Sequence, residues 1–380
     1  MPEPHLSLTP VSYSRLAGWE TDRHGEALAA FRRSCPRLDA LSSGRPLDNG
    51  GAVKDGGPDL GRADEWQAAC KAAAGQPVND DAGARRFFET WFSPFLVADN
   101  DREEGLFTGY YEAELKGSRK KHGPYRHPVH ARPKDLVTAD LGRFKSDWKG
   151  QELNGRLQGG HLVPYASRNE IVSGFLDGKA QELFWVDDPI ELFFLHVQGS
   201  GRISLDDGRT VRVGYAGRNG HPYRAIGAEL ADRGVMRRED ITMPAIRAWL
   251  AANPTQAAGL LNANPSYVFF RTVEGDGPIG AQGVVLTPGR SLAVDKRFLP
   301  YGAPLWLETS DPLDPSRPLR RLLVAQDTGG AITGPVRGDV FWGHGPEAMA
   351  RAGHMKQKGR YFLLLPKRPQ AIAQPIPPSS

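Results

Sequence analysis

Apolar and polar positions follow two different patterns along this chain, and the change falls near residue 105. Before it, apolar side chains recur at the spacing of amphipathic helices, with segments rich in Gly and Pro between them. The pattern predicts helices over residues 25–35, 65–74 and 82–95. In the third helix, which Asp81 introduces, four aromatic side chains form one stripe that we expect to lie in the core: Phe87, Phe88, Trp91 and Phe92.

After residue 105 the apolar positions fall in short runs bounded by Gly and Pro, which is typical of β-strands. We expect strands over residues 106–112, 191–197, 202–205, 210–215, 267–273, 283–286, 304–308, 321–326, 340–342 and 361–365. A turn at 206–208 joins the strands at 202–205 and 210–215 into a hairpin. Helices are expected over 223–232 and 244–252, so the predicted fold class is mainly β with peripheral helices.

The composition agrees with this fold class. Gly 44 and Pro 31 together make up about one residue in five of the 380, which favours many tight turns. The hydrophobic content of 39% is enough to bury a core. Two segments are expected to stand outside the core, a loop over 43–61 and a disordered Pro-rich tail over 367–380.

Charge and apolar runs limit the partners. Lys and Arg number 48 and Asp and Glu 44, a net charge of +4 with no dense basic block, so nothing indicates a nucleic acid partner. No apolar run approaches the roughly 18 to 20 residues that cross a bilayer. Residues 1–5 show no charged leader or lipid-accepting Cys, so an export signal is either absent or removed before this numbering begins.

The two cysteines, Cys35 and Cys70, lie in helix-like patterns and lack the spacing of metal ligands. They are either two separate buried thiols or one disulfide of an oxidising compartment. His196, on an apolar run taken as a strand, is read as a core histidine. Since no zinc motif, phosphate loop or dinucleotide fingerprint occurs, we expect no metal and no cofactor.

Three aspartates beside apolar strand residues are the sharpest chemical signal. Asp327 follows the run 322–326 and precedes a glycine turn, Asp339 precedes the run 340–342, and Asp295 follows the run 292–294. In such places burial and mutual repulsion raise the pKa of a carboxyl toward the range of a general acid. The alternative for Asp295 and Asp327 is a structural role, in which each caps a turn by accepting backbone N–H bonds.

The triplet Asp327-Thr328-Gly329 also matches the triplet of aspartic proteases. That chemistry needs two carboxylates that share one proton, and therefore a second triplet. No second Asp-Thr-Gly or Asp-Ser-Gly occurs, and 380 residues is too long for one half of a dimeric protease. The triplet therefore does not indicate a protease.

The three-aspartate pattern resembles the 3D domain, a double-psi β-barrel. Four further motifs follow in order: FTGYYE at 107–112, FLHVQGSG at 194–201, GYAGRNG at 214–220 and NPSYVFF at 264–270. Together, from about residue 87 to 365, the chain resembles the membrane-bound lytic transglycosylase A (MltA) family. The resemblance implies a barrel formed by residues 1–112 and 272–366, an inserted β-rich glycan-binding domain at 113–271, and an active groove between them.

The activity that the resemblance implies is cleavage of the β-1,4 bond between N-acetylmuramic acid and N-acetylglucosamine in peptidoglycan, leaving a 1,6-anhydromuramic end. In this family a single Asp acts as acid and then as base. Position in the motif assigns that role to Asp339, with Asp327 and Asp295 as its companions. Because the C6 hydroxyl of the substrate is the nucleophile, the second carboxyl of a retaining glycosidase is not required.

The same motifs resemble the positions that bind substrate in the family: Thr108, Gly109, Tyr110, Tyr111, Gln198, Gly199 and Ser200. Neighbours on a strand point to opposite faces, so one of Tyr110 and Tyr111 is expected in the core and the other at the surface. At most one of them would then touch sugar. The glycines beside Ser200 favour close approach of a ligand, or mark a bulge.

The resemblance also implies partners and a location. Glycan strands of peptidoglycan would be the substrate, cell-wall synthesis enzymes further partners, and the periplasm of a Gram-negative bacterium, at the outer membrane in lipoprotein members, the compartment. This sequence has no lipid-accepting Cys near its start, so it gives membrane anchoring no support. The alternative from another class is a non-catalytic wall-binding module, since expansin-like proteins also combine a double-psi barrel with an Asp.

Overall fold

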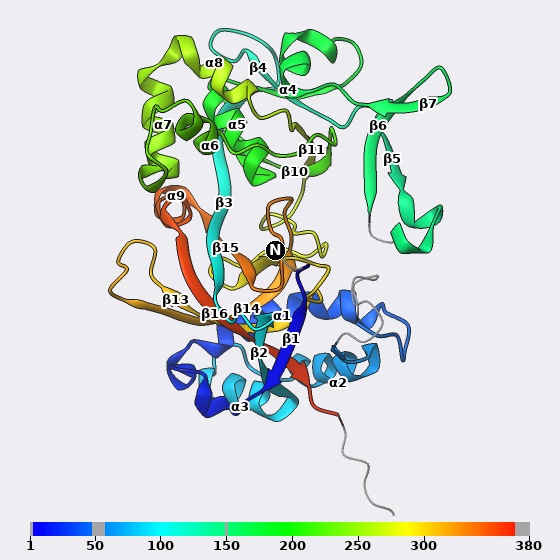
Figure 1. The fold of residues 1–380 in the computed structure, drawn as a ribbon, viewed down its shortest axis with the longest axis vertical. Helices are drawn as coiled ribbons and strands as arrows, with labels where there is room; N and C mark the ends of the chain where they lie inside the picture. Colours follow the sequence, from blue (N-terminus) through cyan, green and yellow to red (C-terminus); the bar gives the residue numbers. More distant parts are fainter. Residues whose placement is uncertain (1–2, 48–57, 149–150, 369–380) are drawn as a thin grey trace, which may run out of the picture.

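The computed structural model describes residues 3–47, 58–148 and 151–368 of the chain. It is mainly β, with helices packed around the sheets (Figure 1). The strands are β1 (Leu6–Pro10), β2 (Phe92–Asp99), β3 (Gly105–Ser118), β4 (His127–His130), β5 (Val137–Asp140), β6 (Glu152–Gln158), β7 (His161–Pro164), β8 (Glu182–Val186), β9 (Ser200–Leu205), β10 (Thr210–Arg218), β11 (Val268–Val273), β12 (Ser291–Val294), β13 (Pro304–Ser310), β14 (Pro318–Asp327), β15 (Arg337–His344) and β16 (Lys356–Pro366). The α-helices of the described residues are α1 (His24–Asp39), α2 (Ala63–Ala74), α3 (Asp81–Trp91), α4 (Arg168–Glu170), α5 (Pro189–Gln198), α6 (Ile226–Asp232), α7 (Met243–Ala252), α8 (Pro254–Asn262) and α9 (Gly345–His354).

Strand β3 and the five C-terminal strands β12 to β16 form a closed ring. Its order is β3, β15, β12, β14, β13 and β16, and β16 pairs with β3, so the row returns to its first strand. Apolar side chains of these strands are fully buried in one core, among them Phe107, Trp306 and Tyr361. Closure leaves none of these six strands with an unpaired edge toward its neighbours, which is why a barrel is a stable way to end a sheet.

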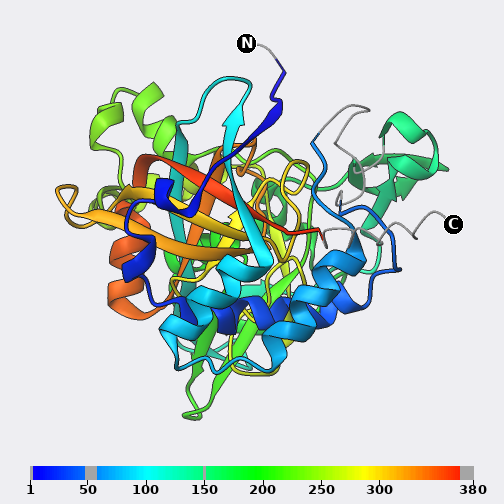
Figure 2. The same ribbon diagram turned by 90° about the horizontal axis from the view of Figure 1, so that it is seen from below.

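Helices α1, α2 and α3 lie against one side of this barrel, as the view from below shows (Figure 2). The predicted aromatic stripe is confirmed as core, since Phe87, Phe88 and Phe92 are buried and Trp91 packs against them. The helix is shorter than predicted, because it ends at Trp91 and Phe92 begins β2. Pro94, two residues later, disfavours helix in the residue before it and turns the chain to an extended conformation.

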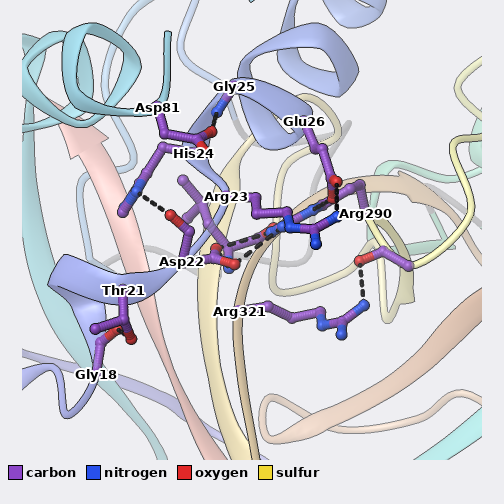
Figure 3. Close-up of polar contacts among 12 residues, drawn as sticks. Gly18, Thr21, Asp22, Arg23, His24, Gly25, Glu26, Asp81, Arg290 and Arg321 are labelled. Atoms are coloured by element: carbon purple, nitrogen blue, oxygen red, sulfur yellow. Dashed lines mark hydrogen bonds and ion pairs between the residues drawn. The ribbon is translucent and has the colours of Figure 1, made fainter. Parts of the chain in front are cut away.

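An ion-pair cluster, with Arg290 and Asp22 buried and Glu26 exposed, links the start of α1 to the barrel (Figure 3). Arg290, just before β12, is only 3% exposed and forms a bidentate pair with Asp22 at 2.7 and 2.9 Å. Its Nε donates to Glu26 over 3.0 Å. Oδ2 of Asp22 also accepts the backbone N–H of Leu322, which connects the cluster to β14. The cluster therefore fixes three segments that are distant in sequence.

Cys35 of α1 and Cys70 of α2 form a disulfide, with 5.4 Å between their Cα atoms. The sequence left open whether these cysteines are two separate thiols or one disulfide, and the structure shows the disulfide. It closes a loop of 35 residues between two helices that also pack on each other.

Strand β3 continues out of the barrel and into the middle part of the chain (Figure 1). Its first half pairs with β15 and β16, and its second half pairs in parallel with β9. The predicted hairpin is confirmed as the antiparallel pair of β9 and β10, and β11 extends it. Helices α5 to α8 form apolar clusters of their own, and β5, β6 and β7 form a separate small sheet that projects to one side (Figure 1).

The segment 191–197, predicted as a strand, is helix α5. Pro189 occupies the first turn, and the carboxylate of Asp188 accepts the backbone N–H groups of Ile190 and Glu191, a strong N-terminal cap. Gly199, in the left-handed conformation with φ of 76°, ends the helix. The continuous apolar run made the prediction wrong, because a helix buried on most sides has no polar stripe. His196 is a buried core residue, as predicted, but on this helix and not on a strand.

Two other elements differ from the prediction. Residues 283–286 form no strand and contribute only an isolated bridge between Ile279 and Val285. Helix α6 begins at Ile226, so 223–225 stay outside it. The predicted loop over 43–61 and the predicted tail over 367–380 lie largely outside the described residues, at 48–57 and 369–380. In the part of the chain that the structure describes, no helix has the length and hydrophobicity needed to cross a membrane.

Candidate active site

Four strands of the barrel bring the candidate acids into one row. Ala293 on β12 is the register partner of Asp327 on β14 and of Asp339 on β15. Thr108 on β3 is in turn the register partner of Asp339. Residues in register on neighbouring strands point to the same face of a sheet. The small side chain of Ala293 therefore lies between two aspartates whose backbones are two strand spacings, about 10 Å, apart.

Asp339 is half-buried and held by one hydrogen bond. The hydroxyl of Thr108 donates to its Oδ1 over 2.7 Å, and Arg337 donates to the same hydroxyl over 2.8 Å. Burial raises the pKa of the Asp339 carboxyl, the charge of Arg337 and the Thr108 bond oppose the rise, and the charge of Asp327 adds to it. Within the described residues Oδ2 of Asp339 accepts no hydrogen bond, so this oxygen is available to a substrate.

Asp327 is held more completely. Its Oδ2 accepts the hydroxyl of Tyr110 over 2.8 Å, and its Oδ1 accepts the backbone N–H groups of Ala281 and Thr328, each over 2.9 Å. Burial raises the pKa of this carboxyl, and the three donors oppose the rise. Both oxygens are thus committed to the protein, which fixes the orientation of the carboxyl.

Asp295 is placed differently. It is 4% exposed, and its carboxylate accepts the guanidinium of Arg297 and the backbone N–H of Gly334, the latter over 2.8 Å. It is not among the groups that shift the pKa of Asp327 or Asp339. The contacts of Asp295 clamp the turn after β12 to the loop before β15.

Both candidate tyrosines are buried, so the expectation of one core and one surface residue is wrong. Tyr110, 8% exposed, packs on Phe341 with 5.2 Å between ring centroids and points to Asp327. Tyr111, 3% exposed, faces the other side and accepts a hydrogen bond from Arg247 over 2.9 Å. The reason is that β3 runs between two apolar clusters at this point, so neither face of the strand is open to solvent.

The remaining candidates support the backbone around these residues. The side-chain oxygen of Gln198 accepts the backbone N–H of Tyr111 over 3.0 Å, Gly199 ends α5, and Ser200 begins β9. A Cβ on Gly109 would come within 2.6 Å of the indole nitrogen of Trp342, so this glycine allows close packing of β3. The structure brings Thr108, Tyr110, Asp327 and Asp339 together and places the others beside them.

Sequence reasoning missed Arg337 and Ala281. Arg337 lies two residues before Asp339, and strand alternation puts both on one face, so that spacing was the available signal. Ala281 contributes only a backbone N–H from an irregular segment, for which its side chain gives no signal. Two carboxyls of raised pKa, one with an oxygen left open, form an arrangement that is chemically suited to acid–base catalysis.

Comparison with known proteins identifies the family. The family model described as the MltA specific insert domain matches residues 106–271, and the 3D domain model matches residues 290–365. Membrane-bound lytic murein transglycosylase A of Vibrio cholerae is 32% identical over 280 residues, which cover 72% of this chain and 69% of that protein.

Solved structures agree. The membrane-bound lytic murein transglycosylase from Agrobacterium tumefaciens superposes with a TM-score of 0.82 at 34% identity, covering 95% of this chain and 98% of that one. Escherichia coli MltA with bound chitohexaose superposes with a TM-score of 0.65 at 28% identity, covering 97% and 96%. The fold is that of the lytic murein transglycosylases, and the chain is an enzyme of this class. The chain belongs to the MltA family.

Proposed function

We propose that this protein is a lytic transglycosylase that cleaves the β-1,4 bond between N-acetylmuramic acid and N-acetylglucosamine in peptidoglycan. The observation that carries the proposal is the difference between the two aspartates. Asp339 has one hydrogen bond and one open oxygen, whereas both oxygens of Asp327 are occupied. Of these two aspartates, Asp339 is the one with an oxygen free to exchange a proton with a substrate.

The chemistry follows from one carboxyl acting twice. The protonated Asp339 donates its proton to the glycosidic oxygen as the bond from that oxygen to C1 breaks. The C6 hydroxyl oxygen of the muramoyl residue then attacks C1 and gives its proton to the Asp339 carboxylate, which restores the acid. No water is consumed, and the product is a 1,6-anhydro ring. The raised pKa of Asp339 favours the protonated form that begins the cycle.

Asp327 has a separate role in this proposal. Positive charge develops at C1 in the oxocarbenium-like transition state, and a fixed carboxylate nearby stabilises it. The three donors to Asp327 hold its oxygens in place. Asp295, clamped to Arg297 and Gly334, acts by shaping the loop before β15.

We also propose that residues 1–112 and 272–366 form the catalytic part, that 113–271 form the glycan-binding part, and that the substrate groove runs between them. The apolar cluster around Phe107 and Trp306 draws only on residues 1–112 and 272–366, and the cluster around Leu230 and Leu250 draws only on residues 113–271, which supports this division. Binding of chitohexaose, a β-1,4-linked oligosaccharide, to the Escherichia coli relative supports a glycan strand as substrate. The disulfide supports an oxidising compartment, which for peptidoglycan is the periplasm.

The test is mass spectrometry of the material released from purified sacculi by the wild-type protein and by Asp339→Asn. We expect muropeptides lighter by one water than hydrolysed ones, present with the wild type and absent with the variant. Hydrolysed products would mean that water is the nucleophile. Binding to sacculi without any soluble product would contradict the proposal and favour the wall-binding module.

A further inference from the structure

A cation from the inserted part of the chain reaches the loop beside the active aspartates. Strand β10 ends at Arg218, and its Nη1 lies 3.1 Å from the position that a Cβ on Gly330 would take. Gly330 comes three residues after Asp327, in the loop between β14 and β15. The contact therefore places this guanidinium, which belongs to the inserted part of the chain, against the loop that follows Asp327.

The charge of Arg218 is not used by the protein. Its side chain is exposed, and within residues 3–47, 58–148 and 151–368 it has neither an ion-pair partner nor a hydrogen-bond acceptor. Other arginines of the same sheet are paired: Arg212 lies 3.3 Å from Glu112, and Arg202 lies 3.7 Å from Glu114. Arg218 is also not among the groups that shift the pKa of Asp327 or Asp339, so its charge does not stabilise either carboxylate.

An exposed aromatic ring stands beside this cation. Tyr215, three residues earlier on the same strand, is 51% exposed; burial raises the pKa of its hydroxyl, and the charge of Arg218 opposes the rise. The register of β10 shifts between Tyr215 and Gly217, which turns the end of the strand. An aromatic face next to a free guanidinium suits a sugar ring that carries an anion, because Arg binds carboxylates with two parallel hydrogen bonds.

We propose that Arg218 binds a carboxylate carried by the muramoyl residue of the glycan, and thereby distinguishes this sugar from N-acetylglucosamine. The inference rests on the proposed function. N-acetylglucosamine has no carboxyl, whereas the lactyl group of N-acetylmuramic acid ends in one. In strands that carry peptides the lactyl carboxyl is an amide, and the peptide then supplies the carboxylates. Arg218 is thus a specificity-determining residue that does not take part in proton transfer.

The test is equilibrium binding in the Asp339→Asn background, which prevents turnover. The probes are chitohexaose, a hexasaccharide of alternating N-acetylglucosamine and N-acetylmuramic acid, its carboxyl methyl ester, and the same hexasaccharide bearing peptides. We expect Arg218→Gln to weaken binding of the free-acid hexasaccharide about tenfold, with the loss shrinking as salt rises. Chitohexaose and the methyl ester should bind equally to both proteins. A loss with the peptide-bearing probe alone would assign the peptide as the source of the carboxylate.

Arg218→Lys and Arg86→Gln are the controls. Lys keeps the positive charge but lacks the paired N–H donors of the guanidinium, so Arg218→Lys should retain part of the preference for the free-acid hexasaccharide over its methyl ester. Arg86, on α3 with a side chain 67% exposed, tests removal of a distant surface cation and should change nothing. Equal losses for chitohexaose and for both acid probes, or no loss at all, would overturn the inference. If wild type releases no anhydromuropeptides from sacculi while the acid preference through Arg218 persists, the proposed function fails and the carboxylate site stands.

Discussion

Thr108 donates its hydroxyl proton to Asp339 over 2.7 Å, from the register position opposite it on the neighbouring parallel strand. Arg337 donates to the same hydroxyl over 2.8 Å. A hydroxyl has one proton, and the bond from Arg337 leaves that proton directed at Asp339. The contact fixes one oxygen of the carboxyl and leaves the other open, and in the proposed mechanism Thr108 would therefore position the acid.

Replacing Thr108 by Val should therefore lower kcat about tenfold, since the side chain keeps its shape but no longer orients the acid. KM should change little, because the proton transfer and not the glycan contact is affected. Thr108→Ser restores the donor and should recover most of the rate. Initial rates on a defined glycan, with the melting temperature as a check on folding, would measure this. A rise in KM at constant kcat would instead mean that Thr108 binds sugar.

The buried pair of Arg290 and Asp22 should contribute strongly to stability. Asp22→Asn leaves a buried guanidinium with its main partner neutralised, which should lower the free energy of unfolding by about 3 kcal/mol. The matched control is Arg23→Gln, which removes an exposed pair with Glu26 and should cost less than about 1 kcal/mol. Urea unfolding of the three proteins at pH 7 measures both values, and equal losses would contradict the role of burial.

The same pair should make stability sensitive to acid. Burial raises the pKa of Asp22, but the bonds and charge of Arg290 and the Leu322 N–H outweigh it, so the pKa in the folded protein is lowered. A lowered pKa means that the stabilisation is complete above the unfolded pKa of about 3.9 and is lost as pH falls through the folded value. Unfolding free energies measured from pH 6 downward should therefore decline less steeply for Asp22→Asn than for wild type.

The disulfide between Cys35 and Cys70 should stabilise the packing of α1 on α2 by restricting the unfolded chain. For a loop of 35 residues the chain-entropy estimate is about 4 kcal/mol. The double variant Cys35→Ala/Cys70→Ala should have a free energy of unfolding lower by up to that amount. Wild type treated with a reductant should show a similar decrease. If reductant leaves wild type unchanged while the double variant is destabilised, the loss comes from packing and not from the crosslink.

Local patterns in the sequence were sufficient for many elements and for the candidate acids. The helix over Met243–Ala252, the hairpin of β9 and β10 and the buried strand before Asp327 all follow from spacing within one segment. The strand predicted over 191–197 failed because α5 is buried on most of its surface, and the signals that mark it as a helix, Asp188, Pro189 and Gly199, stand at its ends. These residues lie just outside the apolar run.

The site shows the same limit. Motifs singled out Asp339 and Asp327, but the pairing of both with Ala293 depends on three strands far apart in sequence. Such register is set by tertiary contacts and not by local pattern. For the same reason the sequence could not show that Asp295 clamps a loop, or that both faces of β3 are covered at Tyr110 and Tyr111.

The surroundings of Asp339 predict how the activity depends on pH. Burial raises its pKa, Arg337 lowers it, and Asp327 raises it. In the proposed mechanism the reaction begins with the protonated Asp339, so kcat should fall as pH rises through this pKa. Asp327→Asn removes a like charge and should move that alkaline limb to lower pH, whereas Arg337→Gln removes an opposite charge and should move it to higher pH. Each shift should be about one pH unit or less.

The opposite signs make the experiment decisive. Arg337→Lys keeps the charge and should leave the alkaline limb near its wild-type position, which separates the effect of the charge from that of the hydrogen bond to Thr108. Asp207→Asn, an exposed change in the β9–β10 turn, is the control and should leave the profile in place. The measurement is kcat on a defined glycan from pH 4 to pH 8. Shifts in the same direction, or an alkaline limb that neither variant moves, would mean that a group other than Asp339 donates the proton.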